Sequence, residues 1–266
     1  MYREYRPEEL TYEKKLLIRS EQVDMTRRLR MSELFRLLEE VSIAHTEELG
    51  CTRRETLDRG LLWIITRQIA EIDEMPVYDD EITVRGWQGD MMHVFFPRFY
   101  EIERDGRVLI RARALWSLID QETRDIIMPE DYGIELPGRP GSDDMMLPAI
   151  VIPESAGEPA ASIPLVTSFS QMDINGHMNN TSYFDMIDDA VWADVSKCAG
   201  PSGDPGSASD PVSAADIMPV PKTLYINYMS EIKAGEHITL NEYKNAGTLW
   251  FEGAGEKPYF RVRITY

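Results

Sequence analysis

One short segment of the chain carries polar side chains of the kinds that perform acid–base chemistry. Residues 173–180 read Asp-Ile-Asn-Gly-His-Met-Asn-Asn, and His177 is one of only four histidines in 266 residues. An amphipathic pattern with helical spacing follows, so this segment is expected to open a helix. The first turn of a helix presents free backbone N–H groups and a positive dipole end, which can stabilise an oxygen that gains negative charge. The alternative is a purely structural helix cap at Asp173 or Asn175.

The same segment occurs twice in the chain. Residues 22–41 align with residues 171–190 without a gap, with glutamine, aspartate and phenylalanine at matching positions and the apolar residues in register. Where the second copy has Asn175 and His177, the first has a threonine and an arginine. Because a reactive group is needed only once per site, we expect an active second copy and a first copy that serves another purpose.

The elements around the two copies follow the same order. Each half has a short strand, a long helix and then several strands with alternating apolar residues, which predicts an α+β fold in which an antiparallel sheet wraps around one helix. The strands that follow the helices are expected near residues 63–72, 81–84, 94–103, 107–118, 223–228, 237–240, 247–252 and 258–265. We expect an N-terminal domain over residues 1–136, a proline-rich linker over 137–164 and a C-terminal domain over 165–266.

The composition excludes several classes of protein. A net charge of −18 argues against nucleic acid as a partner. No apolar run approaches the roughly 18–20 residues of a membrane span, and the first residues lack the apolar core of a signal peptide, so we expect a cytoplasmic protein. The two cysteines, Cys51 and Cys198, have no metal or redox spacing, and no glycine-rich phosphate loop is present. Neither a metal nor another cofactor is expected.

The polar segment resembles a family signature. Residues 173–183 are similar to the D-x-N-x-H-x-N-N-x-x-Y pattern of the acyl-acyl carrier protein (acyl-ACP) thioesterases, which release fatty acids from acyl carrier protein. Residues 63–87, 114–124 and 228–231 resemble further segments of that family. The resemblance implies two tandem hotdog domains, each a sheet around a long central helix. It also implies that the N-terminal domain holds the acyl chain beside a degenerate site and that the C-terminal domain is catalytic.

Four side chains fall on family positions implicated in catalysis: Asp173, Asn175, His177 and Glu231. Some family members have a cysteine directly after that glutamate, whereas here the residue is Ile232. A cysteine nucleophile is therefore excluded at that place, and water is expected to attack the thioester. We expect Glu231 to act as general base and His177 to orient the water or shuttle the proton. Asn175 would position the water or the carboxylate, and Asp173 would fix the turn.

The thioester carbonyl needs a hydrogen-bond donor as well. We expect the backbone N–H groups of Met178 and Asn179, at the start of the helix, to polarise it. The expected partner is acyl carrier protein carrying a fatty acyl group, and a homodimer is compatible with the sheet edges that two hotdog units leave open.

Three other functions fit parts of the same pattern. The protein could hydrolyse coenzyme A thioesters, or it could be a hydratase or dehydratase of the hotdog superfamily, which acts on enoyl or hydroxyacyl thioesters without cleaving them. It could also be an inactive module that binds acyl carriers. The presence of Asn175, His177 and Glu231 together argues against the inactive module, because drift would have erased some of them.

Overall fold

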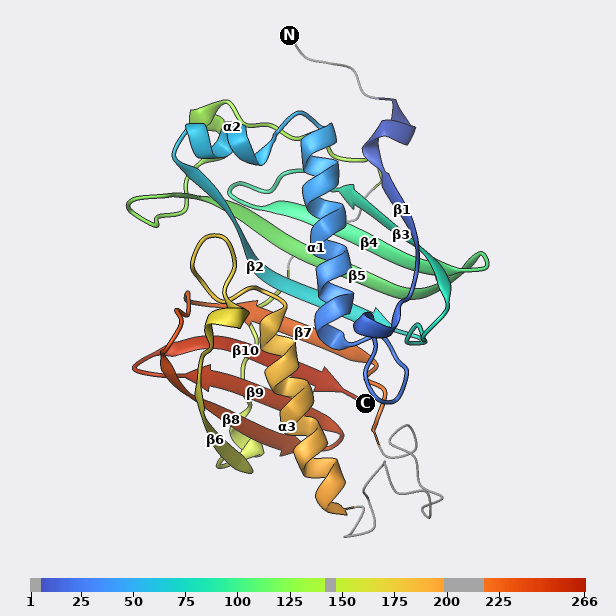
Figure 1. Cartoon of the computed structure of the whole chain (residues 1–266). Helices are drawn as coiled ribbons and strands as arrows, with labels where there is room; N and C mark the ends of the chain where they lie inside the picture. The colour runs from blue at the N-terminus through green and yellow to red at the C-terminus, as the bar shows by residue number, and fades with distance from the viewer. Residues whose placement is uncertain (1–5, 142–146, 199–217) are drawn as a thin grey trace.

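The structure is a computed structural model, and it describes residues 6–141, 147–198 and 218–266. Within these residues, ten strands form one antiparallel sheet in the order β1-β3-β4-β5-β2-β7-β10-β9-β8-β6. The first five strands in this order come from the N-terminal half and the last five from the C-terminal half. Figure 1 shows the two halves one above the other, each with a long helix lying across its sheet.

The elements have the following bounds. The N-terminal half contains β1 (Tyr12–Leu17), α1 (Met31–Glu48), α2 (Arg53–Asp58), β2 (Leu61–Ile72), β3 (Glu81–Gln88), β4 (Phe96–Arg104) and β5 (Arg107–Asp120). The C-terminal half contains β6 (Ala161–Val166), α3 (Ser182–Cys198), β7 (Thr223–Tyr228), β8 (His237–Asn245), β9 (Thr248–Ala254) and β10 (Pro258–Thr265). Short 3₁₀ turns include η2 (Ser20–Gln22) and η5 (Phe169–Gln171).

Helix α1 lies on the sheet through one apolar face. Residues three and four apart along the helix, including Leu34, Leu38 and Val41, are at most 1% exposed. Gly86 in β3 lies under the helix, where a Cβ atom would overlap Val41. The missing side chain therefore allows the helix to approach the sheet closely.

The expected arrangement, two tandem hotdog domains, is confirmed.

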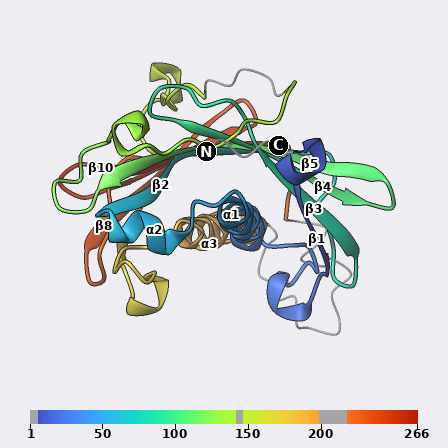
Figure 2. The same ribbon diagram turned by 90° about the horizontal axis from the view of Figure 1, so that it is seen from above.

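The two halves are joined more tightly than a pair of separate domains. Strands β2 and β7 pair antiparallel from Arg67 opposite Asn227 to Glu71 opposite Thr223, which makes the sheet continuous. Seen from above, α1 and α3 lie side by side within the curve of the sheet (Figure 2). The rings of Phe35 and Phe184 stack between the helices, with centroids 4.1 Å apart.

The internal repeat inferred from the sequence is confirmed in the structure. The turns η2 and η5 occupy equivalent places before α1 and α3, and an isolated β-bridge follows each turn. Asp24 in the first copy and Asp173 in the second each accept two backbone N–H groups from the residues two and four positions later. The stacked Phe35 and Phe184 also occupy matching positions of the two copies.

The boundaries of the predicted domains and linker remain a prediction. Strand β6 begins at Ala161, inside the segment 137–164 that we expected to be a linker. Leu147 and Ile150 of that segment are buried against Ile69 of β2 and Tyr225 of β7. This part of the segment therefore covers the place where the two halves pair.

Candidate active site

Residues 173–180, which precede α3 and which we name the polar loop, are held in their turn by the carboxylate of Asp173. This carboxylate accepts hydrogen bonds from the backbone N–H groups of Asn175 at 2.8 Å and His177 at 3.2 Å, and from the Asn175 amide at 3.0 Å. The backbone N–H of Asp173 donates to the carbonyl of His177 at 2.7 Å. Gly176 has a φ of 78°, a value that a glycine adopts without strain. The contacts of Asp173 are thus those of a residue that holds the turn.

The structure brings His177 and Glu231 together. His177 Nε2 lies 3.0 Å from Glu231 Oε2, with the imidazole 14% exposed and the carboxylate 40% exposed. Glu231 lies just after β7, and the carbonyl of the next residue, Ile232, accepts the backbone N–H of Met178 at 2.8 Å. This backbone bond ties the segment of Glu231 to the loop of His177. The two side chains predicted to share the chemistry therefore face one another.

The predicted oxyanion donors are not available. The N–H of Met178 donates to Ile232, and the N–H of Asn179 donates to the carbonyl of Gln171 at 2.8 Å. Helix α3 begins only at Ser182, because the polar loop closes on itself first and the Asn179 side chain then accepts the N–H of Thr181 at 2.9 Å. The expectation that Met178 and Asn179 polarise a carbonyl is therefore corrected: both N–H groups already donate to backbone carbonyls, those of Ile232 and Gln171.

Two arginines of the N-terminal half reach into this site. Arg124 Nη1 lies 3.4 Å from Glu231 Oε1, and Arg53 donates to the Asn175 side-chain oxygen at 2.8 Å. Arg124 has a φ of 64° in the turn after β5, an uncommon value for a residue with a side chain. The Asp120 carboxylate accepts the N–H groups of Thr123 and Glu122 in that turn, which holds the pKa of Asp120 below its usual value.

Sequence reasoning did not assign either arginine to the site. Arg124 lies in a segment that resembled the family, but its role depends on a contact between residues 107 positions apart in the chain. Arg53 and Asn175 are 122 positions apart. No local spacing carries such information, because the contacts arise only when the two halves pack together.

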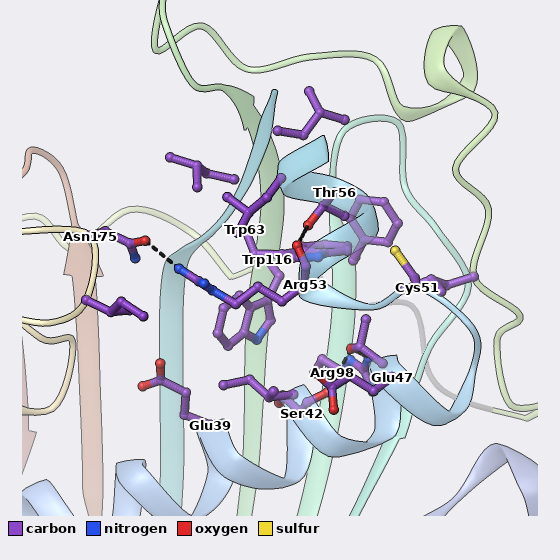
Figure 3. Close-up of a pocket in the computed structure, with 18 of the residues that line it drawn as sticks. Glu39, Ser42, Glu47, Cys51, Arg53, Thr56, Trp63, Arg98, Trp116 and Asn175 are labelled. Atoms are coloured by element: carbon purple, nitrogen blue, oxygen red, sulfur yellow. Dashed lines mark hydrogen bonds between the residues drawn. The ribbon is translucent and has the colours of Figure 1, made fainter. Parts of the chain in front are cut away.

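A cavity of about 320 Å³ lies between α1, α2 and the sheet, and we name it the α1 cavity. Leu61, Trp63, Phe96 and Trp116 supply apolar walls, and Ser42 of α1 lies opposite them. Figure 3 shows Trp63 and Trp116 on the sheet side of this space and Glu39 and Ser42 on the helix side. Concave apolar space of this kind accommodates an extended hydrocarbon chain.

The α1 cavity also has a polar region around Arg98, which is 3% exposed. One guanidinium nitrogen lies 2.7 Å from His45 Nδ1, and another donates to the Thr46 hydroxyl. Burial lowers the pKa of His45 to about 4 and that of Arg98 to about 10. His45 is therefore neutral and accepts the hydrogen bond. No carboxylate of the described residues forms an ion pair with Arg98.

Cys51 borders the α1 cavity as a free thiol. Burial raises its pKa to about 11, so it is not a thiolate at neutral pH. Among the described side chains no other cysteine is present, because the side chain of Cys198 lies outside them. Cys51 is therefore a poor nucleophile.

A second cavity of about 690 Å³ surrounds His177 and Glu231, and we name it the His177 cavity. His177, Tyr228 and Glu231 line it together with three cationic residues, Arg124, Lys233 and Lys257. The two cavities share six lining residues: Glu39, Leu62, Trp63, Trp116, Asp173 and Asn175. They therefore adjoin, and a ligand in the α1 cavity can extend to the carboxylate–imidazole pair.

The fold and the candidate site together define a class: this is a tandem hotdog protein in which the polar loop lies where the two halves meet. Residues 9–133 match the family model described as the acyl-ACP thioesterase N-terminal domain. The resemblance inferred from the sequence motifs is thereby confirmed, and the chain is related to the acyl-ACP thioesterases.

Curated relatives agree with this relationship. The chain is 24% identical over 201 residues to an acyl-[acyl-carrier-protein] hydrolase of Cuphea viscosissima, an alignment that covers 70% of this chain and 48% of the relative. It is 25% identical over 202 residues to a dodecanoyl-[acyl-carrier-protein] hydrolase of Cinnamomum camphora, covering 70% of this chain and 52% of the relative. The chain thus spans about half the length of the curated relatives it matches.

Solved structures show the same fold over nearly the whole chain. An acyl-ACP thioesterase from Bacteroides thetaiotaomicron superposes with a TM-score of 0.75 at 19% identity, covering 98% of this chain and 99% of that one. A 12:0-ACP thioesterase from Umbellularia californica gives a TM-score of 0.72 at 17% identity, covering 96% of each chain. Within the described residues, no helix is both long and apolar enough to cross a membrane.

Proposed function

We propose that this protein hydrolyses fatty acyl-ACP thioesters and releases the free fatty acid. The observation that carries this proposal is the 3.0 Å contact between His177 and Glu231 in a cavity that adjoins an apolar one. In this arrangement the acyl chain lies in the α1 cavity and the thioester reaches the carboxylate–imidazole pair. The relationship to acyl-ACP thioesterases supports the same substrate class.

The chemistry proceeds by attack of water. Glu231 takes a proton from the water molecule while the oxygen of that water forms a bond to the thioester carbon. His177, in the tautomer that carries its hydrogen on Nδ1, accepts this proton from Glu231 at Nε2 and delivers it to the sulfur as the carbon–sulfur bond breaks. The products are a fatty acid and a thiol. Asn175, whose amide nitrogen carries a second hydrogen besides the one given to Asp173, would position the water.

The carrier approaches from the His177 cavity. Arg124, Lys233 and Lys257 line that cavity, in a chain whose net charge is −18. Cations at such a place attract the phosphate of the pantetheine arm and an acidic carrier. Acyl carrier protein is therefore the proposed partner. The cytoplasmic location and the homodimer expected from the sequence remain predictions.

Substitution of the reactive pair tests the proposal. Glu231→Gln and His177→Gln should each lower kcat/KM by about 10²–10⁴, the usual contribution of general acid–base catalysis, measured as thiol release from acyl-ACP. Glu256→Gln and His237→Gln, which change exposed residues elsewhere, serve as matched controls and should retain the wild-type rate. Near-normal rates in folded Glu231→Gln and His177→Gln protein would remove both residues from the mechanism.

The same assay separates the remaining functions. Equal rates with ACP and coenzyme A thioesters of one acyl group would favour an acyl-CoA thioesterase. A change in enoyl absorbance without thiol release would favour a hydratase or dehydratase. No turnover of any thioester, together with tight binding of acyl-ACP, would identify an inactive binding module.

A further inference from the structure

Glu39 on α1 lies where the two cavities meet. It is one of the residues that line both, together with Asp173 and Asn175 of the polar loop. Figure 3 shows its side chain leaving the helix on the side where Asn175 lies. The carboxyl group therefore comes from the N-terminal half but faces the space that a thioester would occupy between the acyl chain and the reactive pair.

The surroundings of Glu39 favour a protonated carboxyl group. Burial and the nearby carboxylate of Asp173 raise its pKa to about 7, and Glu40 acts in the same direction. Arg36 and a hydrogen bond with the Asn180 side chain act against these effects. No ion pair of Glu39 with a cation is found among the described residues. Unlike a carboxylate, a protonated carboxyl group can donate a hydrogen bond.

The site needs such a donor. A thioester carbonyl oxygen gains negative charge when water attacks, and a fixed donor stabilises that charge. The N–H groups of Met178 and Asn179 already donate to the backbone carbonyls of Ile232 and Gln171. A neutral carboxylic acid in a partly buried position is chemically suited to this task.

We propose that Glu39 donates a hydrogen bond to the thioester carbonyl oxygen, so that the N-terminal half supplies the oxyanion donor for the reactive pair of the C-terminal half. This inference rests on the proposed hydrolase function. No bond is broken in this step, because the proton stays on Glu39 while the oxyanion forms and collapses. Glu39 thereby acts as a catalytic residue beside Glu231 and His177.

The repeat provides a matched comparison. Asp188 on α3 occupies the position equivalent to Glu39, and it faces the backbone N–H of Met31, the residue equivalent to Asn180. In the first copy, however, Arg28 stands where the second has His177. A carboxyl group that only stabilises the contact between the helices should behave alike at the two positions, whereas a catalytic one should not.

The kinetic test uses Glu39→Gln and Glu39→Ala with Asp188→Asn as the control. Because Glu39 is protonated below about pH 7, wild-type kcat/KM should fall as the pH rises through that value. Glu39→Gln retains a donor at every pH, so it should stay within about tenfold of wild type and lack this fall. Glu39→Ala should lower kcat by about 10²–10³, the usual loss for one oxyanion donor. Asp188→Asn should keep the wild-type profile.

Two kinetic results would overturn the inference: a loss in Glu39→Gln as large as in Glu39→Ala, or a fall in kcat/KM with rising pH that persists in Glu39→Gln. A second measurement does not depend on turnover. Infrared difference spectra of protein with ¹³C-labelled glutamate, recorded near pH 6, should show a protonated carboxyl band that Glu39→Gln lacks. If the band is present but no thioester is cleaved, the hydrolase proposal fails alone. If thioesters are cleaved without the band, the assignment to Glu39 fails alone.

Discussion

At the scale of single residues, the candidate site depends on hydrogen bonds within one loop and on contacts between residues far apart in the chain. Asp173 holds its own loop through bonds to residues two and four positions away, which a short polar sequence encodes by itself. Glu231 reaches His177 from the segment after β7, and Arg124 reaches Glu231 from the other half of the chain. The site is therefore complete only when the two halves are packed together.

Arg124 should contribute far less to the rate than Glu231. Both partners of the Arg124–Glu231 pair are 40% exposed, and exposed ion pairs contribute about 0.2–1 kcal/mol. Arg124→Gln should therefore lower kcat/KM by at most about fivefold, and the loss should shrink as salt is added. Arg107→Gln, which breaks an exposed pair with Glu74, is the control. A loss near 100-fold would show that Arg124 contacts the substrate directly.

At the scale of the elements, α1 and α3 carry matching carboxyl groups at their contact. Burial and the carboxylates of Asp24, Asp185 and Asp189 raise the pKa of Asp188 to about 8, although the N–H of Met31 opposes the shift. The folded protein thus holds a proton that the unfolded chain releases at lower pH. The contribution of Asp188 to the free energy of unfolding is therefore most favourable below about pH 4, where its carboxyl group is protonated. This contribution is lost as the pH rises towards 8.

Replacing Asp188 should accordingly stabilise the protein in a pH-dependent way. Asp188→Asn keeps an oxygen for the Met31 N–H and removes the buried charge. The free energy of unfolding should increase by about 1–3 kcal/mol at pH 8 and by less at pH 5, measured by urea denaturation. Glu48→Gln, at the exposed end of α1, should have little effect at either pH. An equal gain at both pH values would contradict the titration of Asp188.

At the scale of the whole molecule, several contacts hold the two halves together in one body. Strands β2 and β7 pair across the middle of the sheet, and Phe35 stacks on Phe184 between the helices. On the other face, Ile150 donates its N–H to the side chain of Asn227 in β7, and the carbonyl of Leu147 accepts a hydrogen bond from Arg67 in β2. These contacts couple the folding of one half to that of the other.

We therefore expect a single cooperative unfolding transition. Phe35→Ala removes a ring that is 1% exposed and should lower the free energy of unfolding by about 3–5 kcal/mol without splitting the transition. Calorimetry measures the transition, and hydrogen exchange reports whether β4 and β9 lose protection together. Phe169→Ala, which changes a side chain that is 88% exposed, is the control. Two separated transitions in the wild-type protein would show that the halves fold independently.

Much of the fold was predictable because its signals are local. The spacing of apolar residues marked the two long helices, alternation marked most strands, and the repeat of residues 22–41 in 171–190 showed that one architecture is used twice. The pairing of β2 with β7 was not predictable, because it joins edges of two sheets and leaves no periodic trace in either strand.

The sequence by itself determined the chemistry that is available: an imidazole in a self-closing loop and a carboxylate carried by a matching family segment. Tertiary structure alone decided which groups surround them. Packing of α1 against the loop brought Glu39 to the cavity and changed its pKa, since desolvation depends on what covers a carboxyl group rather than on its neighbours in the chain. The fold also decided that the N–H groups of Met178 and Asn179 donate to Ile232 and Gln171, because a backbone donor bonds whichever acceptor lies beside it.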